Sequence, residues 1–219
     1  MKLTIQEGSW IGFVQLPNCE PIPTFVHRLI PLKTGKGILR LELSVLRYSA
    51  QQHPLTIDIQ VLVHDCDFLV GRRVDEAGKG QTLMIKACKP CTTDLLTVAQ
   101  PTDFHELRAM PDATEEIHIG KEYGAFDSYL IQRGFAPQQM EDKWLIYMTG
   151  NKLQFHRSWT GHCIYSLSVT PREGRLYLDN CTINGNRDQY KSESTLNERD
   201  HVLTLIDYLL IRPFEQHRI

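Results

Sequence analysis

Alternating hydrophobic and polar positions in the first hundred residues predict β-strands. Apolar residues stand at every second position of residues 39–45 and again of residues 55–63. This period of two is typical of a strand with one buried face and one face in water. Shorter strands are expected at residues 2–6, 10–16, 24–30, 67–70 and 82–87. We therefore expect an antiparallel sheet or an open barrel in this half of the chain.

The second half begins with a helical pattern and then returns to strands. Residues 125–133 carry apolar side chains at helical spacing, and Gly134 is a suitable C-cap for a helix that ends there. Turns containing glycine or proline separate the strand patterns that follow. They predict a four-stranded antiparallel meander at residues 144–148, 153–157, 163–169 and 175–183.

An amphipathic helix is expected near the C-terminus. Thr195 and Glu198 match a capping box, and an apolar stripe at helical spacing follows them up to Pro213. Such a helix buries its stripe against a neighbouring sheet, so we expect it to lie on the meander.

These elements predict a strand-rich α+β protein with two domains. Residues 1–100 form the expected antiparallel β domain and residues 114–219 the α+β domain. Residues 101–113 are interpreted as a linker, because Pro101 and Pro111 can neither donate to a strand ladder nor continue a helix.

Composition excludes some classes of partner. The 219 residues carry a formal net charge of −2, so no overall positive field attracts nucleic acid. The longest apolar runs, such as residues 203–211, are too short to span a bilayer. Six cysteines are too sparse for a disulfide scaffold, and residues 1–10 lack a secretory pattern. We therefore expect a cytoplasmic protein with reduced thiols and neither nucleic acid nor membrane as a partner.

The residues richest in chemistry lie between two predicted strands, in the HRSWTG motif of residues 156–161. Strand periodicity points Arg157 toward the core or a cleft and His156 outward. A buried guanidinium needs an acidic or a carbonyl partner, and Asp188 is the candidate for an acidic one. Arginines that hold an anion and aromatic rings that stack on a planar ligand define the candidate binding site. Its residues are His156, Arg157, Trp159, Arg187, Asp188 and Tyr190.

The order of three motifs in this half resembles a poorly characterised bacterial domain. The motifs are KWLIY at residues 143–147, the HRSWTG run, and NRDQY at residues 186–190, within a match that covers residues 126–211. Similar segments accompany ADP-ribosylglycohydrolase-type proteins. The resemblance implies a role around ADP-ribose chemistry or toxin immunity, and it brings no catalytic residues with it.

A metal or redox site is the alternative chemistry. Cys88 and Cys91 form a CKPC motif of the kind found in thioredoxin-like redox pairs. Together with His64 and Cys66 they also form an alternative tetrahedral zinc site, whereas the leading interpretation expects no cofactor. Reduced thiols and a surface histidine are the simpler interpretation of these four residues.

The sequence leaves two functions open. The first is a non-enzymatic binding protein, such as a bacterial immunity or accessory protein, that recognises a protein partner or a small anionic ligand resembling ADP-ribose or a nucleotide. The second is an enzyme on a phosphorylated ligand, with His156 as acid and base and Arg157 holding the anion. An exposed aromatic patch favours the first, and a deep cleft that joins His156, Arg157 and Asp188 favours the second.

Overall fold

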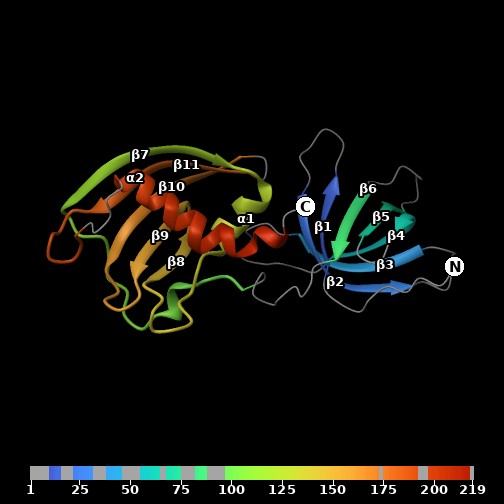
Figure 1. The fold of residues 1–219 in the computed structure, drawn as a ribbon, viewed down its shortest axis with the longest axis horizontal. Helices are drawn as coiled ribbons and strands as arrows, with labels where there is room; N and C mark the ends of the chain where they lie inside the picture. The colour runs from blue at the N-terminus through green and yellow to red at the C-terminus, as the bar shows by residue number, and fades with distance from the viewer. Residues whose placement is uncertain are drawn as a thin grey trace. The chain divides into compact units, whose positions relative to one another are not determined.

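The computed structural model shows a strand-rich α+β protein (Figure 1). It describes residues 10–15, 22–31, 38–45, 55–64, 68–74, 82–87, 97–172, 175–191 and 197–217, with several N-terminal strand residues described by their backbone alone. The chain divides into two compact units. We call Met1–Leu95 with His217–Ile219 the barrel unit and Leu96–Gln216 the sheet unit.

The barrel unit is a closed antiparallel barrel. Each strand pairs with the next in the chain, and β1 also pairs with β6, so the barrel is closed where an open one was among the expectations. Closure removes the two unpaired edges that an open sheet leaves. The strands are β1 (Trp10–Gln15), β2 (Ile22–Pro31), β3 (Ile38–Val45), β4 (Leu55–His64), β5 (Phe68–Arg73) and β6 (Thr82–Ala87). The strand predicted at residues 2–6 lies outside the described residues.

The alternating pattern of β3 divides its side chains between the barrel interior and water. Leu39, Leu41 and Leu43 are buried together with Ile59 of β4. Between them, Arg40 is exposed and forms an ion pair with Asp58 at 2.7 Å, directly across the β3–β4 ladder. The period of two in the sequence therefore predicts correctly which face of this strand is inside.

The sheet unit is built on a five-stranded antiparallel sheet of order β7-β11-β10-β9-β8. Four of its strands form the predicted meander: β8 (Trp144–Thr149), β9 (Lys152–Arg157), β10 (Cys163–Arg172) and β11 (Arg175–Asn184). The fifth, β7 (Thr114–Tyr123), was not predicted. It lies at the edge of the sheet, and most of its side chains are exposed, so it lacks the apolar alternation that identifies a strand in a sequence.

Helical segments cover one face of this sheet (Figure 1). Helix α1 occupies Ala125–Arg133, as predicted, and its C-cap Gly134 has a φ of 72°. The C-terminal helix α2 (Glu198–Leu205) continues into a π-helical segment, η3 (Ile206–Ile211), and a 3-10 helix, η4 (Arg212–His217). This helical layer and the sheet share one hydrophobic core. The core includes Val202, Ile206 and Leu210 on the helical side and Phe155, Tyr165 and Leu167 on the sheet side.

The start of α2 differs from its prediction. Asn197 is the N-cap, and its side chain accepts a hydrogen bond from the Asp200 backbone N–H. The capping box predicted with Glu198 is therefore wrong. The Glu198 carboxylate instead accepts hydrogen bonds from the hydroxyls of Tyr165, at 2.7 Å, and Tyr190, at 3.0 Å. Burial raises the pKa of Tyr165, so its hydroxyl stays protonated as a donor that ties α2 to the sheet.

The opposite face of the sheet is covered by residues 97–108, which comprise the end of the expected β domain and the first part of the segment interpreted as a linker. Ala99 packs with Leu145 and Tyr147 of β8, and Phe104 and Leu107 pack against the same cluster. Backbone hydrogen bonds also join the segment to α1 and to the turn after β9. The segment therefore belongs to the sheet unit. Its prolines exclude it from a strand, and a short 3-10 helix, η2, forms at Pro101–Asp103.

The contact between α2 and the sheet predicts a stability effect. In Tyr165→Phe the Glu198 carboxylate loses a buried donor, so we expect the free energy of unfolding to fall by about 1–3 kcal/mol. Tyr177→Phe is the control, since its hydroxyl has no hydrogen bond within the described part of the chain. Urea unfolding measures both variants. Equal losses in the two would show that the Tyr165–Glu198 contact contributes nothing.

Candidate functional site

The turn between β9 and β10 is organised around the carbonyl of Gly161. The His156 ring donates to this oxygen from Nδ1 at 2.9 Å, and the Arg108 backbone N–H donates to it at 2.9 Å. The Gly161 N–H in turn donates to the Arg157 carbonyl, which closes the turn. The His156 ring and the backbone of Arg108 therefore share one acceptor, the Gly161 carbonyl.

Gly161 also permits a close approach that another residue would prevent. Its φ is 69°, in the left-handed region that favours glycine. A Cβ at this position would collide with the backbone carbonyl of Glu106. The absence of a side chain therefore allows residues 104–108 to lie directly against the turn.

Two further side chains of the HRSWTG motif anchor the turn to the loop before β8. The Ser158 hydroxyl donates to the Asp142 carbonyl, and the Trp159 indole N–H donates to the Met140 carbonyl at 2.8 Å. The indole hydrogen bond fixes the orientation of a ring that is 69% exposed. Met140 itself is 80% exposed, so an aromatic and an apolar side chain meet water beside each other.

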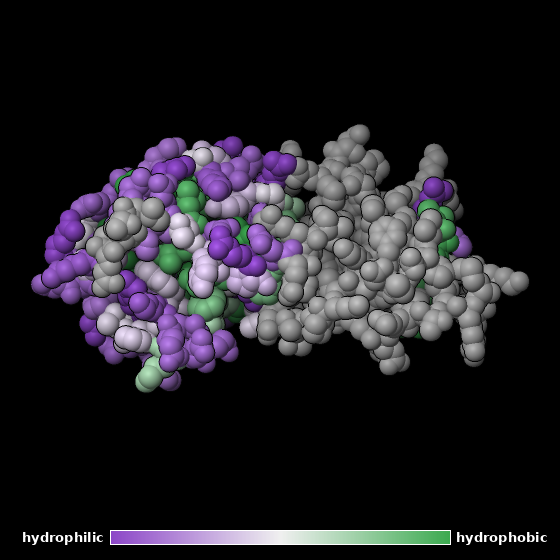
Figure 2. Space-filling view, viewed as in Figure 1, coloured by the Kyte–Doolittle hydropathy of each residue, from purple (hydrophilic) through white to green (hydrophobic). Residues whose placement is uncertain are grey.

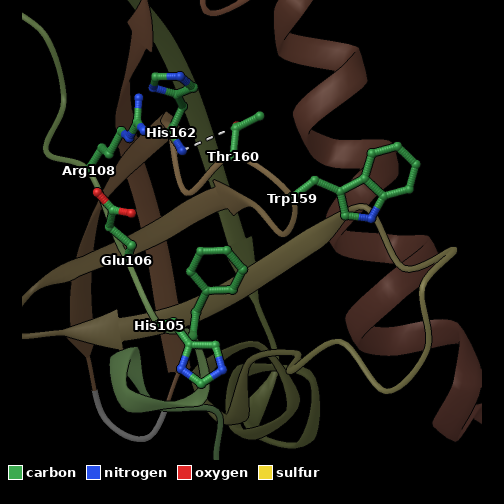
Figure 3. Close-up of a pocket in the computed structure, with 7 residues that line it drawn as sticks. His105, Glu106, Arg108, Trp159, Thr160 and His162 are labelled. Atoms are coloured by element: carbon green, nitrogen blue, oxygen red, sulfur yellow. Dashed lines mark hydrogen bonds between the residues drawn. The ribbon is translucent and has the colours of Figure 1, made fainter.

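A groove of about 410 Å³ lies where the 104–108 segment meets this turn. Figure 3 shows it between Trp159 on one side and Arg108 with His162 on the other. We call it the Trp159 groove and define it by its lining residues: Phe104, His105, Glu106, Arg108, Trp159, Thr160 and His162. Its volume lies within the range of ligand pockets, at about 300–1,000 Å³.

The groove is lined by one basic residue, Arg108, and one acidic residue, Glu106. The Arg108 guanidinium has neither ion pair nor hydrogen bond within the described residues, and Glu106 likewise lacks an ion pair there. Desolvation and the positive charge of Arg108 lower the pKa of His162. The Nδ1 atom of His162 is buried without a hydrogen-bond partner in the described structure. The positive charge of Arg108 therefore acts on its neighbour His162, at one end of the groove.

The structure places His156 and Arg157 on opposite faces of the sheet, as predicted from strand periodicity. His156 does not reach water, however: only 4% of it is exposed, because the 97–108 segment covers its face. The Tyr147 hydroxyl lies 3.3 Å from its Nε2. Arg157 lies over the ring of Trp144 at 4.3 Å, so a cation–π contact replaces the predicted ion pair with Asp188.

The other predicted site residues lie elsewhere. Arg187 is exposed and forms an ion pair with Glu115 at 3.6 Å, and Asp188 is exposed in the turn after β11. Tyr190 is buried against Tyr165. Of the six residues predicted from the sequence, Trp159 alone lines the groove.

The alternative zinc and redox residues fall mostly outside the described residues. Cys66, Cys88 and Cys91 lie there, and His64 is described by its backbone in β4. Across the residues that the structure does describe, no cluster of three or more metal-binding side chains is present. Burial raises the pKa of the thiols of Cys163 and Cys181 to about 12, which disfavours the reactive thiolate.

No helix in the described parts of the chain is long and apolar enough to cross a bilayer. Hydrophilic residues cover most of the face of the sheet unit seen in Figure 2, with hydrophobic residues between them.

Sequence reasoning missed most of the groove. Phe104, His105 and Arg108 stand in the segment interpreted as a linker, and His162 follows directly after the HRSWTG motif. An aromatic residue, an imidazole and a cation within five positions were the available signal. What the sequence does not state is that Gly161 lets this segment lie against the turn.

Comparison of the chain with protein-family models, curated proteins and solved structures finds no match.

The close approach at Gly161 predicts a graded response to substitution. Gly150→Ala places a side chain at a φ of 54° in open space, whereas Gly161→Ala adds a collision with the Glu106 carbonyl. We expect the first variant to cost about 1 kcal/mol of stability and the second clearly more. Thermal unfolding of both variants measures the difference, and equal losses would contradict the role of this contact.

The burial of His156 predicts that stability falls in acid. Burial lowers the pKa of His156, whereas in the unfolded chain the ordinary value is about 6.5. The unfolded state therefore binds the proton more tightly, so the free energy of unfolding decreases as the pH drops below about 6.5. His162 and His201, whose pKa values burial also lowers, add to this dependence.

Urea unfolding between pH 7.5 and 5.5 tests the share of His156. His156→Gln removes one titrating group, so its stability should depend less steeply on pH than that of the wild-type protein. Parallel curves would mean that His156 contributes nothing to the acid sensitivity, whatever the variant costs at neutral pH.

Proposed function

We propose that this chain is a non-enzymatic binding protein and that the Trp159 groove is its binding site. The observation that carries the proposal is the hydrogen bond from the Trp159 indole to the Met140 carbonyl, which holds an exposed ring in one orientation beside a groove. A preorganised aromatic side chain offers contact area to a ligand at a low cost in conformational entropy. Exposed tryptophan is also enriched among residues that dominate binding.

The surroundings of the HRSWTG motif argue against catalysis by it. His156 is buried, with one ring nitrogen against Gly161 and the other near Tyr147, so it has no free nitrogen to present to a substrate. Ser158 donates its hydroxyl proton to a backbone carbonyl, and Asp188 is not paired with Arg157. A general acid or base must reach the proton that it transfers, and neither His156 nor Ser158 is placed to do so.

The proposed setting is the bacterial cytoplasm, in an immunity or accessory role. This part of the proposal rests on the motif resemblance of residues 126–211 and on the sparse cysteines. The buried, unpaired thiols of Cys163 and Cys181 are compatible with a reducing compartment.

A fragment screen tests the binding function. Ligand-observed NMR of the wild-type protein against a library of small aromatic and heteroaromatic fragments should give hits that compete with one another for one site. Trp159→Ala should weaken these hits by about fivefold or more, because it removes the ring contact. A bound fragment incubated with the protein for a day should remain chemically unchanged.

Tyr208→Ala is the matched control. Tyr208 is also an exposed aromatic residue of the sheet unit, but it lies on the C-terminal helical layer and contacts Arg212. Hits that survive in Trp159→Ala and disappear in Tyr208→Ala would move the site away from the groove. Conversion of a fragment into product would overturn the non-enzymatic assignment.

A further inference from the structure

We infer that the ligand of the Trp159 groove carries an anionic group, phosphate or carboxylate, attached to a planar ring, with the anion held by Arg108 and the ring against Trp159. The inference rests on the proposed binding function and names the class of ligand. It follows from the positions of one unpaired guanidinium and two aromatic side chains along the same groove.

Arg108 is held in place by its backbone while its side chain stays available. Its N–H donates to the Gly161 carbonyl, and the residue forms a parallel bridge with His162. In Figure 3 the guanidinium lies beside the His162 ring at the edge of the groove that it lines, and it has no protein acceptor within the described residues. A guanidinium presents its donors as a planar fork that matches the oxygens of phosphate and carboxylate.

The ring contact is expected on the far side of the groove from Arg108. Figure 3 shows Trp159 well separated from Arg108 and His162. Phe104, which is half-buried, adds a second aromatic residue to the lining. A ligand that reaches both ends must therefore combine the charged group and the ring in one molecule.

Glu106 distinguishes selective binding of an anion from nonspecific binding to the groove. Its carboxylate lines the same groove but lies beyond ion-pair distance from Arg108. An anionic ligand is attracted by Arg108 and repelled by Glu106, so removal of the two charges must change affinity in opposite directions. The lowered pKa of His162, which Arg108 causes in part, supports a positive field at the Arg108 end.

Three probes that share the naphthalene ring system and differ in their charged group test the requirement for an anion. Naphthyl phosphate, naphthoate and the neutral naphthalene methanol are titrated into the full chain, and the dissociation constants are measured by ligand-observed NMR. We expect at least one anionic probe to bind about tenfold or more tightly than the neutral one. The two anionic probes distinguish a phosphate from a carboxylate preference.

Four variants assign the effect to the groove. Arg108→Gln should reduce the affinity for the anionic probes to that for the neutral probe, and Arg108→Lys should restore it in part. Glu106→Gln should tighten anionic binding and leave the neutral probe unchanged. Arg187→Gln is the matched control, because Arg187 is an exposed arginine of the same unit that does not line the groove.

The outcomes separate this inference from the proposed function. If all three probes bind equally and still depend on Trp159, the groove binds ligands but the anion requirement is wrong. Opposite shifts of the anionic probes in Arg108→Gln and Glu106→Gln, absent in Arg187→Gln, support it. If no probe binds and the fragment screen finds no site at Trp159, the proposed function fails as well.

Discussion

The close contact between Gly161 and the backbone of Glu106 is the constraint on which the rest of the site depends. A side chain at position 161 would occupy the space of that carbonyl. Because glycine stands there with a φ of 69°, residues 104–108 lie against the turn after β9 and cover the outer face of β8 and β9. The same contact buries His156 and creates the groove in front of Trp159. Fold and site therefore share one backbone contact.

The density of functional groups in the HRSWTG motif has a structural explanation for most of its members. His156 and Ser158 donate hydrogen bonds to backbone carbonyls, and the Arg157 guanidinium lies over the Trp144 ring. A turn that must hold two separate loops needs several side-chain donors, since irregular backbone leaves carbonyls that strand ladders do not satisfy. Trp159 combines both roles: its N–H fixes the turn, and its ring faces water. Chemical richness in a sequence is therefore evidence of bonding, and exposure identifies the part available to a ligand.

Hydrophobic periodicity predicts much of the fold and little of the site. Strand β3 follows from alternation, because its leucines lie in the barrel interior and Arg40 between them is exposed, and the meander strands follow from apolar runs separated by turns. The edge strand β7 could not be recognised, because it does not depend on burial of an apolar stripe. The sequence pattern places the helix start at Thr195 instead of Asn197, because both residue types serve as N-caps. The groove could not be predicted because it joins residues 104–108 to residues 159–162, and the proline-based interpretation makes the first of these a linker between two domains. Contacts between irregular segments depend on backbone geometry that side-chain patterns do not encode.

The two faces of the sheet are covered in different ways, and this difference explains how the binding surface is supported. On one face, Tyr165 and Tyr190 attach α2 through the Glu198 carboxylate, and the helical layer closes the main core. On the other face a segment almost without regular structure completes the burial, and such segments tolerate polar side chains because half of their surface stays in water. Arg108 and Glu106 occupy that wet half while Leu107 between them packs inward. Exposed and packed side chains therefore alternate along residues 106–108. The packing of Leu107 holds the charged residues on either side of it in the groove.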